Sequence, residues 1–193
     1  MTRTHVLAAL LAAGTLAVTA APAGAAQLKV KDARGDVWGA ADAVNVTPSP
    51  TISEGDITKT VVAHQRDAVT VKIGFVKLSR TGPYAQYAVR LQGSKGVVRE
   101  VLVESSRRDR SGVHRVFNAQ GREVGDCDAQ HRIDYKRDLV KVKVDRGCLA
   151  RSRKVRANVN AAHAAGTGVF YSDNVHDTAA QSTAWTDWVK RAH

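Results

Sequence analysis

The segment Val69-Thr70-Val71-Lys72-Ile73-Gly74-Phe75 carries the clearest structural signal in this chain. Its large apolar residues occupy every second position, and Thr70 and Lys72 lie between them. Successive side chains of a β-strand point to opposite faces, so this spacing predicts a strand with one apolar and one polar face. Such a strand is stable only beside partner strands that bury the same face.

Similar valine-rich alternating segments recur along the chain, separated by short linkers of turn-forming residues. Eight further strands are expected at residues 58–63, 86–91, 97–103, 113–117, 131–135, 139–144, 155–159 and 169–171. Because no segment has a convincing helical repeat, this pattern predicts an all-β chain: a single antiparallel β-sandwich, immunoglobulin-like or jelly-roll-like. Residues 32–56, which include Pro48 and Pro50, are expected to form a loop-rich stretch.

The first 25 residues are typical of a secretory signal peptide. Arg3 and His5 precede an apolar run at residues 6–18, and the small residues Ala23-Gly24-Ala25 follow it. The apolar run is too short to span a bilayer. We therefore expect cleavage after Ala25 and a secreted, extracellular, monomeric product, residues 26–193, that forms one domain and has no membrane anchor.

The two cysteines predict one structural disulfide, because exported proteins usually oxidise such a pair. If residues 131–135 and 139–144 form a hairpin with Tyr135 opposite Val140, the same register places Cys127 opposite Cys148. Both sulfur atoms would then lie on the inward face, at the base of the hairpin.

Positive charge is concentrated in residues 99–156, which contain 16 basic and 9 acidic side chains. Two groups stand out: an arginine-rich hairpin tip and a set of alternating cations expected on one sheet face. They comprise Arg107, Arg108 and Arg110 at the tip and Lys141, Lys143, Lys154 and Arg156 on the face. This pattern favours binding of extracellular polyanions such as anionic cell-wall polymers or glycans. The alternative is a solvated surface whose charge prevents aggregation.

Specific nucleic-acid recognition is not expected, because stacking aromatic residues do not accompany these charges. A second cluster is acidic: Asp32, Asp36 and Asp56 lie in the loop-rich stretch. Clustered carboxylates in an exported protein can hold calcium, although aspartate is also an ordinary turn residue. Beyond a possible calcium ion, no cofactor is expected.

None of the catalytic motifs that fix a nucleophile, base or metal by local spacing occurs in the chain. His163, Asp173, His176 and Asp177 are close enough in sequence to form a metal or acid/base site, and each is equally at home in a turn. A non-enzymatic binding module is therefore favoured. The alternatives are a small secreted hydrolase with a dispersed His/carboxylate site and a protein-binding or inhibitor module.

The motif Asp32-x-x-Gly35-Asp36, followed by Gly55-Asp56-Ile57 and an alternating strand, resembles a group of small secreted actinobacterial proteins. That resemblance extends through Ile133-Asp134-Tyr135, Cys148-Leu149 and Trp188-Val189 and implies an exported protein without naming a ligand. The same short motif is distantly similar to the opening of family 9-like carbohydrate-binding and DOMON-like sandwiches. Those folds imply a sugar or haem site, but the residues here include no methionine and histidine pair suited to haem.

Overall fold

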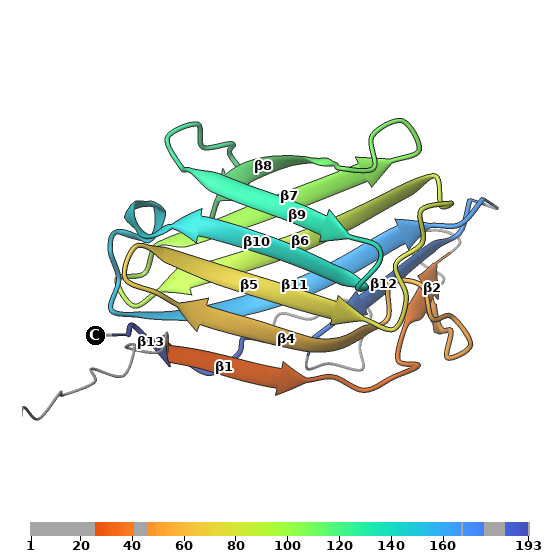
Figure 1. The fold of residues 1–193 in the computed structure, drawn as a ribbon, viewed down its shortest axis with the longest axis horizontal. Coiled ribbons are helices and arrows are strands. Elements are labelled where there is room, and N and C mark those ends of the chain that lie inside the picture. The colour runs from red at the N-terminus through yellow and green to blue at the C-terminus, as the bar shows by residue number, and fades with distance from the viewer. Residues whose placement is uncertain (1–25, 41–45, 167, 176–183, 193) are drawn as a thin grey trace, which may run out of the picture.

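Two antiparallel β-sheets packed face to face make up the fold (Figure 1). The computed structural model describes residues 26–40, 46–166, 168–175 and 184–192. The expected signal peptide, residues 1–25, lies outside the described residues. Within them, no helix is long and apolar enough to cross a membrane.

The first sheet has five strands and lies at the front in Figure 1. Its spatial order is β1 (Ala26–Lys31), β4 (Ile57–His64), β5 (Ala68–Phe75), β10 (Leu139–Asp145) and β9 (Ala129–Asp134). Every neighbouring pair is antiparallel. The alternating segment Val69–Phe75 lies in β5, the central strand of this sheet.

The second sheet has eight strands. Its spatial order is β3 (Val46–Pro48), β2 (Trp38–Ala40), β12 (Phe170–Asn174), β11 (Lys154–Ala164), β6 (Tyr84–Gly93), β7 (Val98–Ser106) and β8 (Val113–Asn118), and the short β13 (Val189–Lys190) pairs with β11. These pairs are antiparallel as well. The prediction of an antiparallel all-β sandwich is confirmed.

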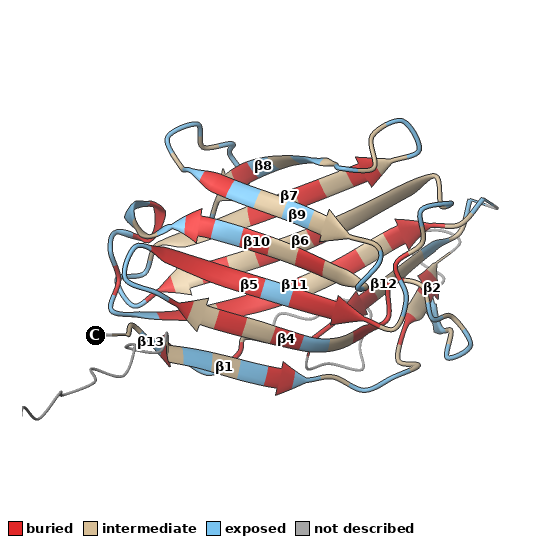
Figure 2. Ribbon diagram, viewed as in Figure 1, coloured by how far each residue is buried: buried red, intermediate tan, exposed pale blue. Residues whose placement is uncertain are grey.

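The core lies between the sheets and is built from the alternate residues of each long strand. Val71 and Ile73 of β5 are fully buried, as are Val89 and Leu91 of β6 in the opposite sheet. Figure 2 shows the result as alternating buried and more exposed blocks along β4 and β10, whereas the central strand β5 is buried along almost its whole length. The period-two pattern in the sequence therefore corresponds to burial between the two layers.

All nine expected strands are present, with boundaries that differ by a few residues. The expectation that residues 32–56 form only a loop-rich stretch is partly wrong, because β2 and β3 extend the second sheet there. Each of these strands has three residues, and β2 contains Gly39. Strands this short carry too few residues for an alternating pattern, so only the pairing of β2 with β12 and of β3 with β2 identifies them.

The expected register of the β9–β10 hairpin is wrong by two residues. Ile133, not Tyr135, lies opposite Val140. The turn is centred one residue earlier than expected, because Asp134 lies opposite Leu139. Within this turn, Asp138 adopts a left-handed φ of 49°, and its carboxylate accepts a hydrogen bond of 2.7 Å from the Leu78 amide. Because side chains alternate with a period of two, a shift of two residues leaves every side chain on its expected face.

The disulfide between Cys127 and Cys148 forms as predicted, with the Cα atoms 5.1 Å apart. After β10 the chain enters a short 3₁₀-helix, η1 (Arg146–Leu149), whose first turn is capped by the Asp145 carboxylate. This turn, rather than a continued strand ladder, brings Cys148 back toward Cys127. The bridge lies against the core, since Cys148 is 9% exposed.

Replacing both cysteines, Cys127→Ser with Cys148→Ser, should preserve the fold and lower the free energy of unfolding by about 3 kcal/mol, because the denatured chain gains conformational freedom. Urea unfolding followed by circular dichroism measures the change. Two reactive thiols in the oxidised wild-type protein would contradict the disulfide itself.

Candidate functional site

The outer face of the five-stranded sheet carries a cross-strand row of residues that are mostly cationic. The strand registers place one residue from each strand side by side in the order Lys29, Val61, Lys72, Lys141 and Arg132. Four of these five neighbouring positions are therefore cationic. Lys29, Lys72 and Arg132 are exposed, and Lys141 is half-buried.

Further lysines flank this row. Lys31 pairs with Lys59 across β1 and β4, and Lys143 follows Lys141 on β10. We call the set the cationic face: Lys29, Lys31, Lys59, Lys72, Arg132, Lys141 and Lys143. Like charges directly opposite one another on a sheet destabilise it, so this arrangement works against the fold. Among the described residues, the only ion pair that involves a member of this set joins Arg132 to Asp134 at 3.2 Å.

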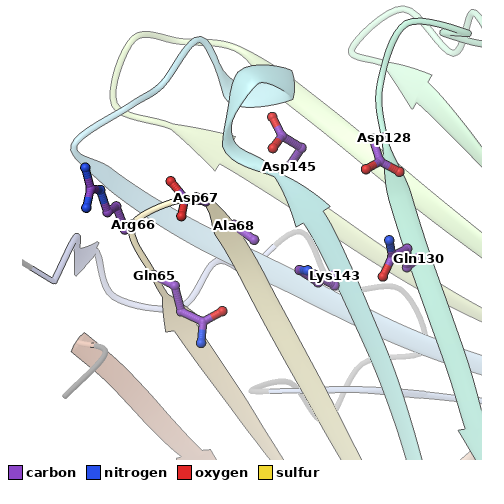
Figure 3. A pocket seen from close by; sticks show the side chains of 8 residues that line it. All are labelled: Gln65, Arg66, Asp67, Ala68, Asp128, Gln130, Lys143 and Asp145. Atoms are coloured by element: carbon purple, nitrogen blue, oxygen red, sulfur yellow. The ribbon is translucent and has the colours of Figure 1, made fainter. Parts of the chain in front are cut away.

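A shallow pocket of about 360 Å³ ends the cationic face beside the turn between β4 and β5 (Figure 3). Its lining residues are Gln65, Arg66, Asp67, Ala68, Asp128, Gln130, Lys143 and Asp145. Three carboxylates and two cations line this pocket, so its formal charge is negative, whereas that of the cationic face is positive. The Asp145 carboxylate is already used as a cap, since it accepts a hydrogen bond of 2.6 Å from the Gly147 amide.

The cations predicted to share one sheet face lie on two faces. Lys141 and Lys143 belong to β10 and the cationic face, whereas Lys154 and Arg156 belong to β11 in the other sheet. The expectation of a single face is therefore wrong. Sequence adjacency suggested it, but the chain passes through η1 and crosses to the opposite layer between the two strands.

Arg156 has a different set of contacts. Its guanidinium lies 5.1 Å from the Trp185 ring and 4.9 Å from the Trp188 ring, and its Nε donates to Gln92 at 2.8 Å. The Thr186 amide also donates to the carbonyl of Ala157 at 2.8 Å. Arg156 and the two tryptophans thus fasten the C-terminal segment to the outer face of the eight-stranded sheet.

The arginine tip joins β7 to β8, as expected. Arg107 and Arg108 are exposed, and Arg110 is half-buried. The Asp109 carboxylate shapes the turn by accepting from the Ser111 hydroxyl and from the amides of Ser111 and Gly112, and these bonds lower its pKa. Among the described residues, none of the three arginines forms an ion pair.

A carboxylate cluster lies where β1 ends, β2 begins and β12 ends. Asp32, Asp36 and Asp173 each place one oxygen within 4.8 Å of the others. Asp173 is 1% exposed, and its Oδ2 accepts a hydrogen bond of 2.6 Å from the amide of Ile57 in the opposite sheet. Burial, the larger effect, together with the charges of Asp36 and Asp32, raises the pKa of Asp173 to about 8.

Asp56 lies beside this cluster. Its Oδ2 accepts from the Gly35 amide at 2.9 Å, and Gly35 has a φ of +76° that favours glycine. Burial raises the pKa of both Asp36 and Asp56. In the described part of the chain, the buried Oδ1 atoms of these two residues accept no hydrogen bond. A buried carboxylate oxygen that accepts no hydrogen bond is stabilised by protonation of the group or by a neighbouring cation.

Asp32 and Asp36, named from the sequence as calcium ligands, are therefore brought together, and Asp56 lies next to them. Asp173 is a further member that was not expected, since its position in the sequence suggested a group with His163. No local pattern could have identified it, since Asp173 reaches the cluster only through the pairing of β12 with β2 and β11.

His163 lies at the base of a separate cleft of about 420 Å³ that Lys77, Arg107 and Tyr171 also line. It is 6% exposed, and its ring stacks on Tyr171 with centroids 5.2 Å apart. Burial lowers the pKa of His163 to about 4.

Among the described residues, His163 and Asp173 do not form a hydrogen-bonded acid/base pair. Asp173 accepts from the amides of Ile57 and Asn174, and no hydrogen bond joins it to His163 within the described residues. The other two residues of the expected group, His176 and Asp177, lie outside the described part of the chain.

No protein-family model, curated protein or solved structure matches this chain. The resemblance to small secreted actinobacterial proteins and to carbohydrate-binding or DOMON-like sandwiches consequently stays a prediction.

Lowering the pH should destabilise the fold through His163. Its folded-state pKa lies below the ordinary value of 6.5, so the folded chain binds fewer protons than the unfolded chain between pH 4 and 6.5. The stabilisation present above pH 6.5 is lost as the pH falls. Between pH 7 and 4.5, wild type should lose roughly 2 kcal/mol more than His163→Gln, by urea unfolding. Parallel losses in both proteins would contradict this assignment.

Proposed function

We propose that this protein is a secreted, non-enzymatic module that binds an anionic polymer on its cationic face. The observation that carries the proposal is the cross-strand row of Lys29, Lys72, Lys141 and Arg132. Strands lie about 4.8 Å apart, so the row extends roughly 19 Å across the sheet. A linear polyanion lying across the strands can meet these cations in succession.

Two further features support this proposal. The sheet holds like charges opposite one another at a cost in stability, and a bound polyanion would offset that repulsion. The Cys127–Cys148 disulfide is typical of proteins that work outside the reducing cytosol, in keeping with the expected signal peptide. The arginine tip is a separate group of exposed cations that could contact the same polymer.

Binding through the cationic face should be salt-sensitive and specific to that face. We expect Lys72→Glu with Lys141→Glu to elute from immobilised heparin at a clearly lower salt concentration than wild type, because exposed charges are screened by salt. The matched control is Lys154→Glu with Lys190→Glu, a neighbouring pair on the other sheet. It changes net charge equally and should elute at higher salt than the first variant. Equal elution of both variants would show that only net charge matters.

We propose, second, that the carboxylate cluster holds a calcium ion. The supporting observation is that Asp36 Oδ1 and Asp56 Oδ1 are buried and accept no hydrogen bond in the described structure. Asp32, Asp36 and Asp173 would supply hard oxygen ligands of the kind that calcium prefers. The ion would join the loop between β1 and β2 to β12, and so stabilise the end of the sandwich.

Calcium should therefore raise the thermal stability of the protein. At a concentration about 100 times the dissociation constant, the gain is about 2.7 kcal/mol, or several degrees in the melting temperature. Asp36→Asn should abolish the gain, whereas Asp126→Asn, at an exposed position away from the cluster, should retain it. Differential scanning calorimetry with calcium and with chelator makes the comparison. A melting temperature that calcium leaves unchanged would rule out the site.

A further inference from the structure

His114 and His131 meet at one edge of the sandwich. His114 lies on β8, the edge strand of the eight-stranded sheet, and His131 lies on β9, the edge strand of the five-stranded sheet. Their Nδ1 atoms are 2.9 Å apart, and the rings stand edge to face with centroids 5.0 Å apart. Both side chains are half-buried, so the pair is open to solvent on one side.

The surrounding hydrogen bonds decide where the protons are. His131 Nε2 lies 2.9 Å from the Ser111 carbonyl oxygen, which can only accept, so this nitrogen carries the proton. In the neutral ring, Nδ1 of His131 then holds a lone pair that faces His114. A histidine that donates one ring N–H to a backbone carbonyl and presents the other nitrogen as a lone pair is oriented as metal-binding histidines are.

The separation of the two nitrogens fits a metal ion. Two nitrogens bound at about 2.05 Å and at right angles to each other are about 2.9 Å apart, as in a tetragonal site. His114 can offer its Nδ1 lone pair by moving its proton to Nε2, with no net release of protons. Burial, the larger effect, and the neighbouring His131 lower the pKa of His114.

The local charge also favours a cation. The Asp109 carboxylate, in the turn beside Ser111, interacts electrostatically with His131, and the Asp128 carboxylate interacts in the same way with His114. The turn packs closely against the pair at Gly112, where a Cβ would lie 2.8 Å from the Glu104 carbonyl oxygen and 3.4 Å from His131 Nε2.

We propose that His114 and His131 form a two-histidine site for a divalent transition metal, with copper(II) preferred, whose remaining positions are filled by water. Imidazole nitrogen suits copper, nickel and zinc, and copper(II) binds most tightly in this series and adopts tetragonal geometry. The ion would connect the edge strands of the two sheets. This site is separate from the cationic face and from the carboxylate cluster.

The test is a titration of the mature protein with copper(II) chloride, followed by electron paramagnetic resonance and by the melting temperature. We expect hyperfine structure from two nitrogens, a rise in melting temperature, and weaker effects from nickel and zinc. His114→Gln and His131→Gln should each weaken copper binding at least tenfold. The controls His163→Gln and His176→Ala should bind copper as wild type does.

Copper affinity that is unchanged in His131→Gln would overturn the proposal and leave a simple hydrogen bond between two rings. If either variant fails to fold, paramagnetic broadening in wild type decides, because the ring signals of His114 and His131 should disappear before that of His163. The Lys72→Glu/Lys141→Glu and Asp36→Asn variants should retain copper binding. Failure of the polyanion or calcium proposal is thereby distinguished from failure of this one.

Discussion

Burial of alternate side chains between two sheets is the constraint on which the rest of this structure depends. Every long strand must present one apolar face inward, as β5 does with Val71 and Ile73. The intervening residues then have only the outer faces of the sandwich to occupy. A chain with 29 basic and 18 acidic residues must therefore place its excess positive charge on these two outer faces and on the turns.

The two outer faces use that charge differently. On the eight-stranded sheet, Arg156 is enclosed by Trp185 and Trp188 and helps to fasten the C-terminal segment, so its charge contributes to packing. On the five-stranded sheet, the cations align across strands, and the one ion pair among them in the described structure is that of Arg132. For this reason we propose that a polyanion binds on the five-stranded sheet and not on the other face.

The ends and edges of the sandwich concentrate the polar groups that the core cannot hold. Asp173 joins the sheets through the Ile57 amide, and His163 lies beneath a cleft with its pKa lowered by burial. At the side edge, His114 and His131 meet across the two layers. The Asp173–Ile57 and His114–His131 contacts join separate sheets, because at the ends and edges polar groups of both layers can meet outside the apolar core. His163 instead stacks on Tyr171 of the neighbouring strand in its own sheet.

The sequence by itself determined nine of the strands, their faces and the disulfide, because each follows from local alternation or from a register that tolerates an error of two residues. It also identified Asp32, Asp36 and Asp56 as neighbours along the chain. Tertiary structure decided the rest. Lys72 and Lys141 became neighbours only when β10 paired with β5, and Asp173 joined the acidic cluster only when β12 took its place beside β2. Which strands pair, and which sheet each enters, depends on long-range packing that a period of two in one segment does not encode.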